Sequence, residues 1–115
     1  MGLLSSLFPP SITAEEAHER AGRRDAVILD VRERREFRAG HAPGSKNIPL
    51  STLAKRTHEL PTQRTYVAVC RSGNRSRAAT AQLRSAGFEV LNLKGGMHAW
   101  RRAGLPMEPR TGRVI

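Results

Sequence analysis

The only cysteine of the chain lies in a segment whose residue types suit nucleophilic chemistry. Cys70 ends the apolar run at residues 65–70. Polar, small and cationic residues follow it: Arg71, Ser72, Gly73, Asn74, Arg75 and Ser76. A thiol at the carboxyl end of a strand, facing the first turn of a helix, lies where backbone N–H groups converge. These groups and the nearby arginines favour the thiolate, which is the nucleophilic form. The sequence therefore predicts a reactive Cys70; the alternative is a buried structural thiol.

The six residues after Cys70 also suit the binding of a small anion. Gly73 lets the backbone turn tightly and approach a ligand closely. The two serines and the asparagine are small hydrogen-bonding residues, and the arginines supply positive charge. We therefore expect residues 71–76 to bind the substrate. The interpretation requires main-chain N–H groups that point at the sulfur of Cys70 and a thiol that is open to water.

A second polar pair follows another apolar run. Asp30 lies near the end of residues 26–31, and Arg32 comes two positions later, on the same face of an extended chain. A structural ion pair, or a hydrogen bond that anchors a loop, is more common for such a pair than acid–base catalysis. A position of Arg32 at the mouth of the site is the alternative. We therefore expect Asp30 and Arg32 to support the site.

The elements that must position these residues alternate between extended and helical patterns. Extended runs are expected at residues 26–31, 47–50, 65–70 and 90–93. Helices are expected at residues 14–21, 32–39, 52–60, 75–86 and 97–103. This alternation predicts a single α/β domain with a mostly parallel sheet of about five strands and helices on both faces. Ligands of such sheets bind beyond the carboxyl ends of the strands, where Cys70 is expected.

Local signals define several boundaries. Thr13 and Glu16 form a capping box, and Gly22 suits the position after the helix that this box starts. Ser51 is expected to cap the helix at residues 52–60. We divide the chain into an apolar, proline-ended leader at residues 1–10, a domain at 11–106 and a tail at 107–115. The tail has no periodicity and is expected to be loose.

Composition excludes several classes of function. Lys and Arg outnumber Asp and Glu by 20 to 10 in 115 residues, so the net charge of +10 attracts anions. The arginines are dispersed and aromatic residues make up 4%, which argues against nucleic-acid binding. No apolar run reaches the roughly 18 residues that span a bilayer. The four histidines lack ligand spacing, so we expect no metal and no cofactor. We expect a cytoplasmic protein in which Cys70 stays a thiol.

Four segments, in the right order, resemble rhodanese-domain sulfurtransferases. They are LDVRE at 29–33 with Glu36 and Phe37, GHAPGSKNIP at 40–49, CRSGNRS at 70–76, and LKGGMHAW at 93–100. With the closing GLP at 104–106, the resemblance covers about residues 11–106. It implies a small α/β domain with a central parallel sheet.

The resemblance also implies an activity. The cysteine that matches Cys70 attacks a sulfane-sulfur donor such as thiosulfate and becomes a persulfide. Cyanide, a cellular thiol or a sulfur-acceptor protein then takes the sulfur. Backbone N–H groups of the loop that matches residues 71–75 stabilise the persulfide anion. A cation directly after the cysteine, here Arg71, resembles the members that prefer thiosulfate to mercaptopyruvate.

Two alternatives stay open. A persulfide carrier or sensor that acts with a partner protein uses the same loop. Cysteine-based phosphatases and arsenate reductases of related fold place five residues between the cysteine and an arginine. Here four residues separate Cys70 from Arg75, and Ser76 stands where the phosphatase arginine lies. The shorter loop favours a single sulfur atom over a tetrahedral phosphate.

Overall fold

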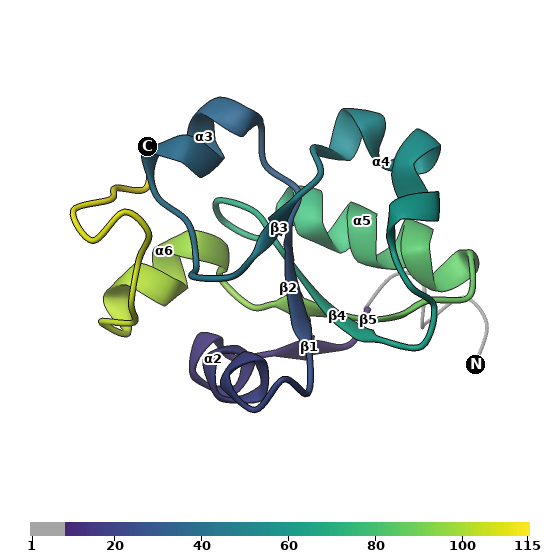
Figure 1. The fold of residues 1–115 in the computed structure, drawn as a ribbon, viewed down its shortest axis with the longest axis horizontal. Coiled ribbons are helices and arrows are strands. Elements are labelled where there is room, and N and C mark those ends of the chain that lie inside the picture. Colours follow the sequence, from purple (N-terminus) through teal and green to yellow (C-terminus); the bar gives the residue numbers. More distant parts are fainter. Residues whose placement is uncertain (1–8) are drawn as a thin grey trace.

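The architecture is a five-stranded parallel sheet covered by helices on both faces (Figure 1). The computed structural model describes residues 9–115, so residues 1–8 of the expected leader lie outside the described residues. The strands are β1 Ser11–Ile12, β2 Val27–Asp30, β3 Lys46–Asn47, β4 Thr65–Val69 and β5 Glu89–Leu93. Their order in the sheet is β1-β5-β4-β2-β3, and all neighbours are parallel. The predicted α/β fold is confirmed, and β4, which precedes Cys70, is the central strand.

The helices lie in two layers. They are α2 Ala14–Gly22, α3 Arg34–Ala39, α4 Leu50–Arg56, the 3₁₀ turn η1 Thr57–Glu59, α5 Asn74–Ser85 and α6 Gly96–Arg102. Side chains of α4 and α5, such as Leu53 and Leu83, pack in one core with Leu29 of β2. Side chains of α2 and α6, such as Ala17 and Trp100, pack in a second core. None of the helices within residues 9–115 is long and apolar enough to cross a membrane.

Some predicted helix ends are confirmed and others are wrong. The capping box at Thr13 is present, with the N–H of Glu16 donating to its hydroxyl at 3.1 Å. Gly22 does not follow the helix as predicted, because it is the last residue of α2. The left-handed conformation occurs two residues later, at Arg24 with φ 59°. Ser51 does not cap a helix, because α4 already begins at Leu50 after Pro49. The fixed φ of proline suits the residue before a helix, and here no side-chain cap is used.

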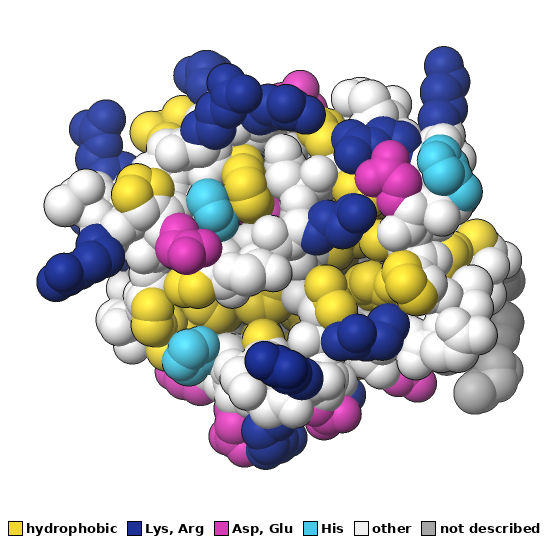
Figure 2. Space-filling view, viewed as in Figure 1, with side chains coloured by type: hydrophobic (Ala, Val, Ile, Leu, Met, Phe, Trp, Pro, Cys, Tyr) yellow, Lys and Arg dark blue, Asp and Glu magenta, His cyan; other side chains and the backbone are white. Residues whose placement is uncertain are grey.

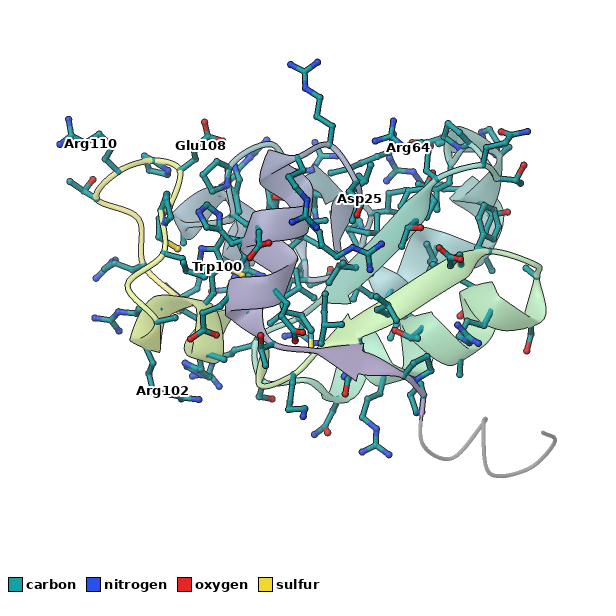
Figure 3. The ribbon with its side chains drawn as sticks, turned by 90° about the horizontal axis from the view of Figure 1, so that it is seen from below. Asp25, Arg64, Trp100, Arg102, Glu108 and Arg110 are labelled. Atoms are coloured by element: carbon teal, nitrogen blue, oxygen red, sulfur yellow. The ribbon has the colours of Figure 1, made fainter. Side chains whose placement is uncertain are left out.

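The tail at residues 107–115 is packed rather than loose. Glu108 and His41 exchange two backbone hydrogen bonds, of 2.8 and 3.0 Å. The N–H of Arg113 donates to the carbonyl of Ala39 at 2.7 Å, and Val114 packs against the core beside α6. Figure 3 shows this segment beyond α6, with Arg110 pointing away from the body of the molecule. The contacts are mostly made by the backbone, which leaves no periodic pattern in the sequence.

Candidate active site

Two polar groups converge on the sulfur of Cys70. Cys70 directly follows β4, and the chain turns at Gly73, the N-cap of α5, with φ 124°. This left-handed conformation favours glycine. The backbone N–H of Gly73 donates to Sγ at 3.0 Å, and the hydroxyl of Ser76 lies 3.3 Å from Sγ. That hydroxyl also lies 3.1 Å from the carbonyl of Gly73, so its one proton serves either acceptor. The arrangement suits a negatively charged sulfur atom.

The thiol is buried, contrary to the expectation of a sulfur open to water. Cys70 is 1% exposed, whereas Arg71 and Ser72 are exposed. The sulfur therefore lies beneath the rim of its own loop. Central strands of a parallel sheet are covered on both faces, and this cover extends to the residue after β4. A reagent must be narrow to reach Sγ, or the loop must open.

Helix α6 supports the loop from behind. The N–H of Met97 donates to the carbonyl of Cys70 at 2.8 Å, and the N–H of His98 to that of Arg71 at 3.2 Å. A Cβ atom on Gly96 would lie 2.5 Å from the Arg71 carbonyl oxygen. Gly96 also has a φ of 62°. Glycine is therefore needed for the close approach of α6, which fixes the backbone on one side of the thiol.

Arg75 is held by a carboxylate. Its Nη1 and Nη2 atoms donate to the two carboxylate oxygens of Glu36 on α3, at 2.7 and 2.9 Å. These bonds hold the pKa of Glu36 at about 2, well below its usual range. Arg75 therefore joins α5 to α3, and its charge is balanced. Glu36 lies in a segment that resembles the family, but no pattern in the sequence pairs it with Arg75, which is 39 positions away.

Replacing Glu36 with Gln is expected to lower the free energy of unfolding at pH 7 by about 1–2 kcal/mol, because Arg75 loses a two-bonded ionic partner. The folded pKa of about 2 lies below the ordinary 4.5. The ion pair therefore stabilises the fold above pH 4.5, and this contribution is lost as the pH falls towards 2. Urea unfolding of both proteins at pH 7 and pH 3 measures the difference, which should narrow at pH 3. An equal difference in the free energy of unfolding at pH 7 and pH 3 would contradict a stabilising ion pair between Glu36 and Arg75.

Asp30 and Arg32 form a structural ion pair beneath the surface. Both side chains are 0% exposed. The Arg32 Nε and Nη2 atoms donate to the Asp30 carboxylate at 2.9 and 2.7 Å, and Nη2 also donates to the carbonyl of Gly40 at 2.8 Å. Arg32 Nη1 is buried and has no hydrogen-bond partner within the described part of the chain. Arg32 therefore anchors the segment after α3 and does not face the mouth of the site.

The other predicted residues lie on the rim. Arg71, Ser72 and Asn74 are exposed, and Arg71 Nε donates to a backbone oxygen of Ile115 at 2.9 Å. Figure 2 shows Lys and Arg side chains dispersed over the face in view, with a group above α3. That helix carries three exposed arginines: Arg34, Arg35 and Arg38. The structure thus brings Gly73 and Ser76 onto the sulfur and leaves the other predicted contacts at the edge.

Known proteins resemble this chain in sequence and in structure. A sulfurtransferase from Allochromatium vinosum is 39% identical over 103 residues, which cover 88% of this chain and 96% of the relative. The putative sulfur carrier protein YrkF from Bacillus subtilis is 36% identical over 93 residues; they cover 79% of this chain and 50% of YrkF. The structure of a rhodanese-related protein from Thermoplasma volcanium superposes with a TM-score of 0.81 at 34% identity, covering 85% of this chain and 96% of that one.

The match to a family covers most of the described chain. The family described as "Rhodanese-like domain" matches residues 13–103. This range begins at the capping box of α2 and ends just after α6, so it contains Cys70, its loop and the helices that support it. The chain belongs to the family of rhodanese-like domains.

Proposed function

We propose that this protein transfers a sulfane sulfur from thiosulfate, or from a related persulfide or polysulfide, to cyanide or a thiol through a persulfide on Cys70. One observation carries the proposal: the N–H of Gly73 and the hydroxyl of Ser76 both lie on Sγ, at 3.0 and 3.3 Å. Oriented donors of this kind stabilise an anion without reorganising during the reaction. The family membership and the likeness to a sulfurtransferase support the same chemistry.

The proposed reaction has two displacement steps. The Cys70 thiolate attacks the outer sulfur of thiosulfate, the S–S bond of the donor breaks, and sulfite leaves with the electron pair. Cys70 is then a persulfide whose outer sulfur carries the negative charge. Cyanide attacks that outer sulfur, the new S–S bond breaks, and thiocyanate leaves while Cys70 returns to the thiolate. This is covalent catalysis with a ping-pong order.

The burial of Cys70 favours a narrow donor. A thiosulfate ion presents one terminal sulfur atom, which is slim enough to approach a sulfur beneath the rim of a loop. A phosphate ester requires a cradle around four oxygen atoms. The loop from Cys70 to Gly73 instead directs one N–H at one sulfur atom. We therefore expect no hydrolysis of an aryl phosphate, and a clear phosphatase activity would support the alternative instead.

Thiosulfate is expected to be a better donor than mercaptopyruvate, because Arg71, directly after Cys70, is an exposed cation that attracts a dianion. Cyanide-dependent formation of thiocyanate from each donor measures the preference. An Arg71→Gln variant should raise the KM for thiosulfate about two- to fivefold, as expected for one exposed charge. Arg34→Gln, which removes an exposed charge from α3, is the matched control. A preference for mercaptopyruvate would contradict the donor assignment.

A second candidate function is a persulfide carrier that acts with a partner protein. Two observations favour it: the likeness to YrkF, a putative sulfur carrier, and the burial of Cys70, which would shield a stored persulfide from solvent. Comparison of small-molecule acceptors with protein thiols discriminates the two functions. Turnover that appears only with a protein acceptor supports the carrier, and turnover with cyanide alone supports the enzyme.

A further inference from the structure

Helix α3 lies at the edge of the sheet where Cys70 is placed. Asp30, the last residue of β2, is the register partner of Val69, which directly precedes Cys70. The chain that leads into α3 and the loop after Cys70 therefore leave the sheet at the same level. Glu36 of α3 then binds Arg75, in the first turn of α5, with contacts of 2.7 and 2.9 Å. These contacts hold α3 beside the loop that carries the thiol.

The surface of α3 that is open to solvent is strongly basic. Glu36 is 7% exposed and is occupied by Arg75, whereas Arg34, Arg35 and Arg38 are exposed. Positions 34 and 38 are one helical turn apart, and positions 35 and 38 are three residues apart, so the three side chains are neighbours. Figure 2 shows a group of Lys and Arg side chains above this helix. Like charges at these spacings repel each other.

No contact within the chain neutralises these three charges. None of the three arginines forms an ion pair or a side-chain hydrogen bond within residues 9–115. Glu33, directly before α3, is exposed but does not pair with them. Arg75, in contrast, is balanced by Glu36. The short helix therefore keeps a surplus of positive charge that an anionic group of another molecule can neutralise.

A hollow of about 220 Å³ lies between two of these arginines and is lined by Arg34, Phe37, Arg38 and Asn47. Phe37 stacks on His41 with ring centroids 3.7 Å apart. The side-chain amide of Asn47 donates to two backbone carbonyls, each at 3.0 Å. Two of the lining side chains are therefore held in place, and the other two are cations. Such a hollow fits a side-chain carboxylate, which arginine binds through two parallel hydrogen bonds.

We propose that this α3 surface, formed by Arg34, Arg35, Arg38 and the hollow, docks an acidic surface segment of a sulfur-acceptor protein beside Cys70. The inference rests on the proposed sulfur transfer and assigns a charge to the acceptor. A cysteine thiolate of the acceptor attacks the outer sulfur of the Cys70 persulfide. The S–S bond of that persulfide breaks, Cys70 leaves as the thiolate, and the acceptor becomes the persulfide. Complementary charge speeds the encounter and orients the two proteins.

The chemistry of the surface favours an acidic protein over a nucleic acid. Aromatic residues make up 4% of the chain, which leaves few platforms on which bases could stack. The hollow also suits a single carboxylate. Thiosulfate and cyanide are small ions that reach Cys70 without docking on α3, so the surface acts on a protein acceptor alone.

The binding test uses two fluorescein-labelled synthetic peptides that differ only in having glutamates in one and glutamines in the other. Neither contains cysteine, and fluorescence anisotropy gives each Kd without a sulfur donor. The protein should bind the glutamate peptide more tightly than the glutamine peptide. Arg34→Gln combined with Arg38→Gln should weaken binding of the glutamate peptide about two- to tenfold, as expected for two exposed ion pairs.

Two further variants define the cause. Arg101→Gln combined with Arg102→Gln is the matched control, because it removes two exposed charges from the last turn of α6. It should change the Kd less than about twofold, since salt screens charges beyond about 8 Å. Arg34→Glu combined with Arg38→Glu reverses the charge and should bind a lysine peptide more tightly than the glutamate peptide. Thermal unfolding checks that each variant is folded at the assay temperature.

Sulfur transfer is measured separately, as release of sulfite from thiosulfate with a cysteine-containing form of each peptide as the acceptor. The KM for the acidic cysteine peptide should rise about two- to tenfold in the Arg34→Gln, Arg38→Gln protein. Turnover with cyanide is the reference, because cyanide needs no docking surface. An equal loss of turnover with cyanide would overturn a role specific to the protein acceptor.

The possible results separate this inference from the proposed function. Equal weakening by the α6 control, or a glutamate peptide bound no better than the glutamine peptide, overturns the docking surface. Tighter binding of a single-stranded oligonucleotide of the same charge, lost on substitution of the α3 arginines, overturns it in favour of a nucleic acid. Binding that depends on α3 without any sulfite release supports the surface and contradicts the sulfur transfer. Turnover with cyanide but no binding that depends on α3 leaves the proposed function standing and overturns the inference.

Discussion

Replacing Cys70 with Ser is expected to reduce thiocyanate formation from thiosulfate by a factor on the order of 10³ or more, as for other enzymes that lose their nucleophile. A serine hydroxyl does not accept a sulfane sulfur at neutral pH, so the first displacement is lost. The substitution changes one atom and keeps an acceptor for the N–H of Gly73. The fold should therefore be retained.

Steady-state assays with thiosulfate and cyanide measure this effect, with circular dichroism and the unfolding midpoint as controls for folding. Arg71→Gln is the comparison variant, because it should change the KM for thiosulfate several-fold without removing turnover. Retention of substantial turnover by a folded Cys70→Ser protein would show that another group carries the sulfur. The Cys70→Ser protein also measures any transfer of sulfur from thiosulfate to cyanide that does not need Cys70.

Replacing Asp30 with Asn is expected to destabilise the fold by about 3–5 kcal/mol, because it leaves the charge of Arg32 buried and unbalanced. Both side chains are 0% exposed, so water cannot replace the lost carboxylate. A domain of this size has a total stability of about 5–15 kcal/mol, so the variant loses a large part of it. Urea unfolding at pH 7 gives the difference in the free energy of unfolding.

A double variant tests whether the unpaired buried charge causes the loss of stability. Asp30→Ala combined with Arg32→Met removes both charges, and it should be more stable than Asp30→Ala alone because no unpaired charge stays buried. A double variant no more stable than the single one would contradict this explanation. Loss of the ion pair is also expected to affect the site. The residue between Asp30 and Arg32, Val31, donates its N–H to the carbonyl of Val69, which directly precedes Cys70.

The elements that hold Cys70 could be predicted from the sequence because their signals are local. The apolar run before Cys70 becomes the central strand β4. The edge position that Pro49 predicts is found for β3, although this strand is Lys46–Asn47 and Leu50 already belongs to α4. The capping box at Thr13 involves only residues three positions apart. Ser51 fails as a cap because two local signals compete there, and Pro49 starts the helix earlier.

The parts that sequence could not predict depend on tertiary contacts. Glu36 and Arg75 form a pair only after α3 and α5 are placed beside each other. The tail is docked through backbone groups and a few side chains, such as Val114, which give no periodic pattern. The burial of Cys70 depends on how its own loop folds over it.

The proposal that Cys70 carries sulfur is tested most directly by the intact mass of the protein after incubation with thiosulfate and removal of the reagent. The account predicts a gain of one sulfur atom that cyanide removes and that is absent from the Cys70→Ser protein. Because the chain has one cysteine, the gain needs no further assignment. An unchanged mass for protein whose thiol is still alkylated by iodoacetamide would contradict the account.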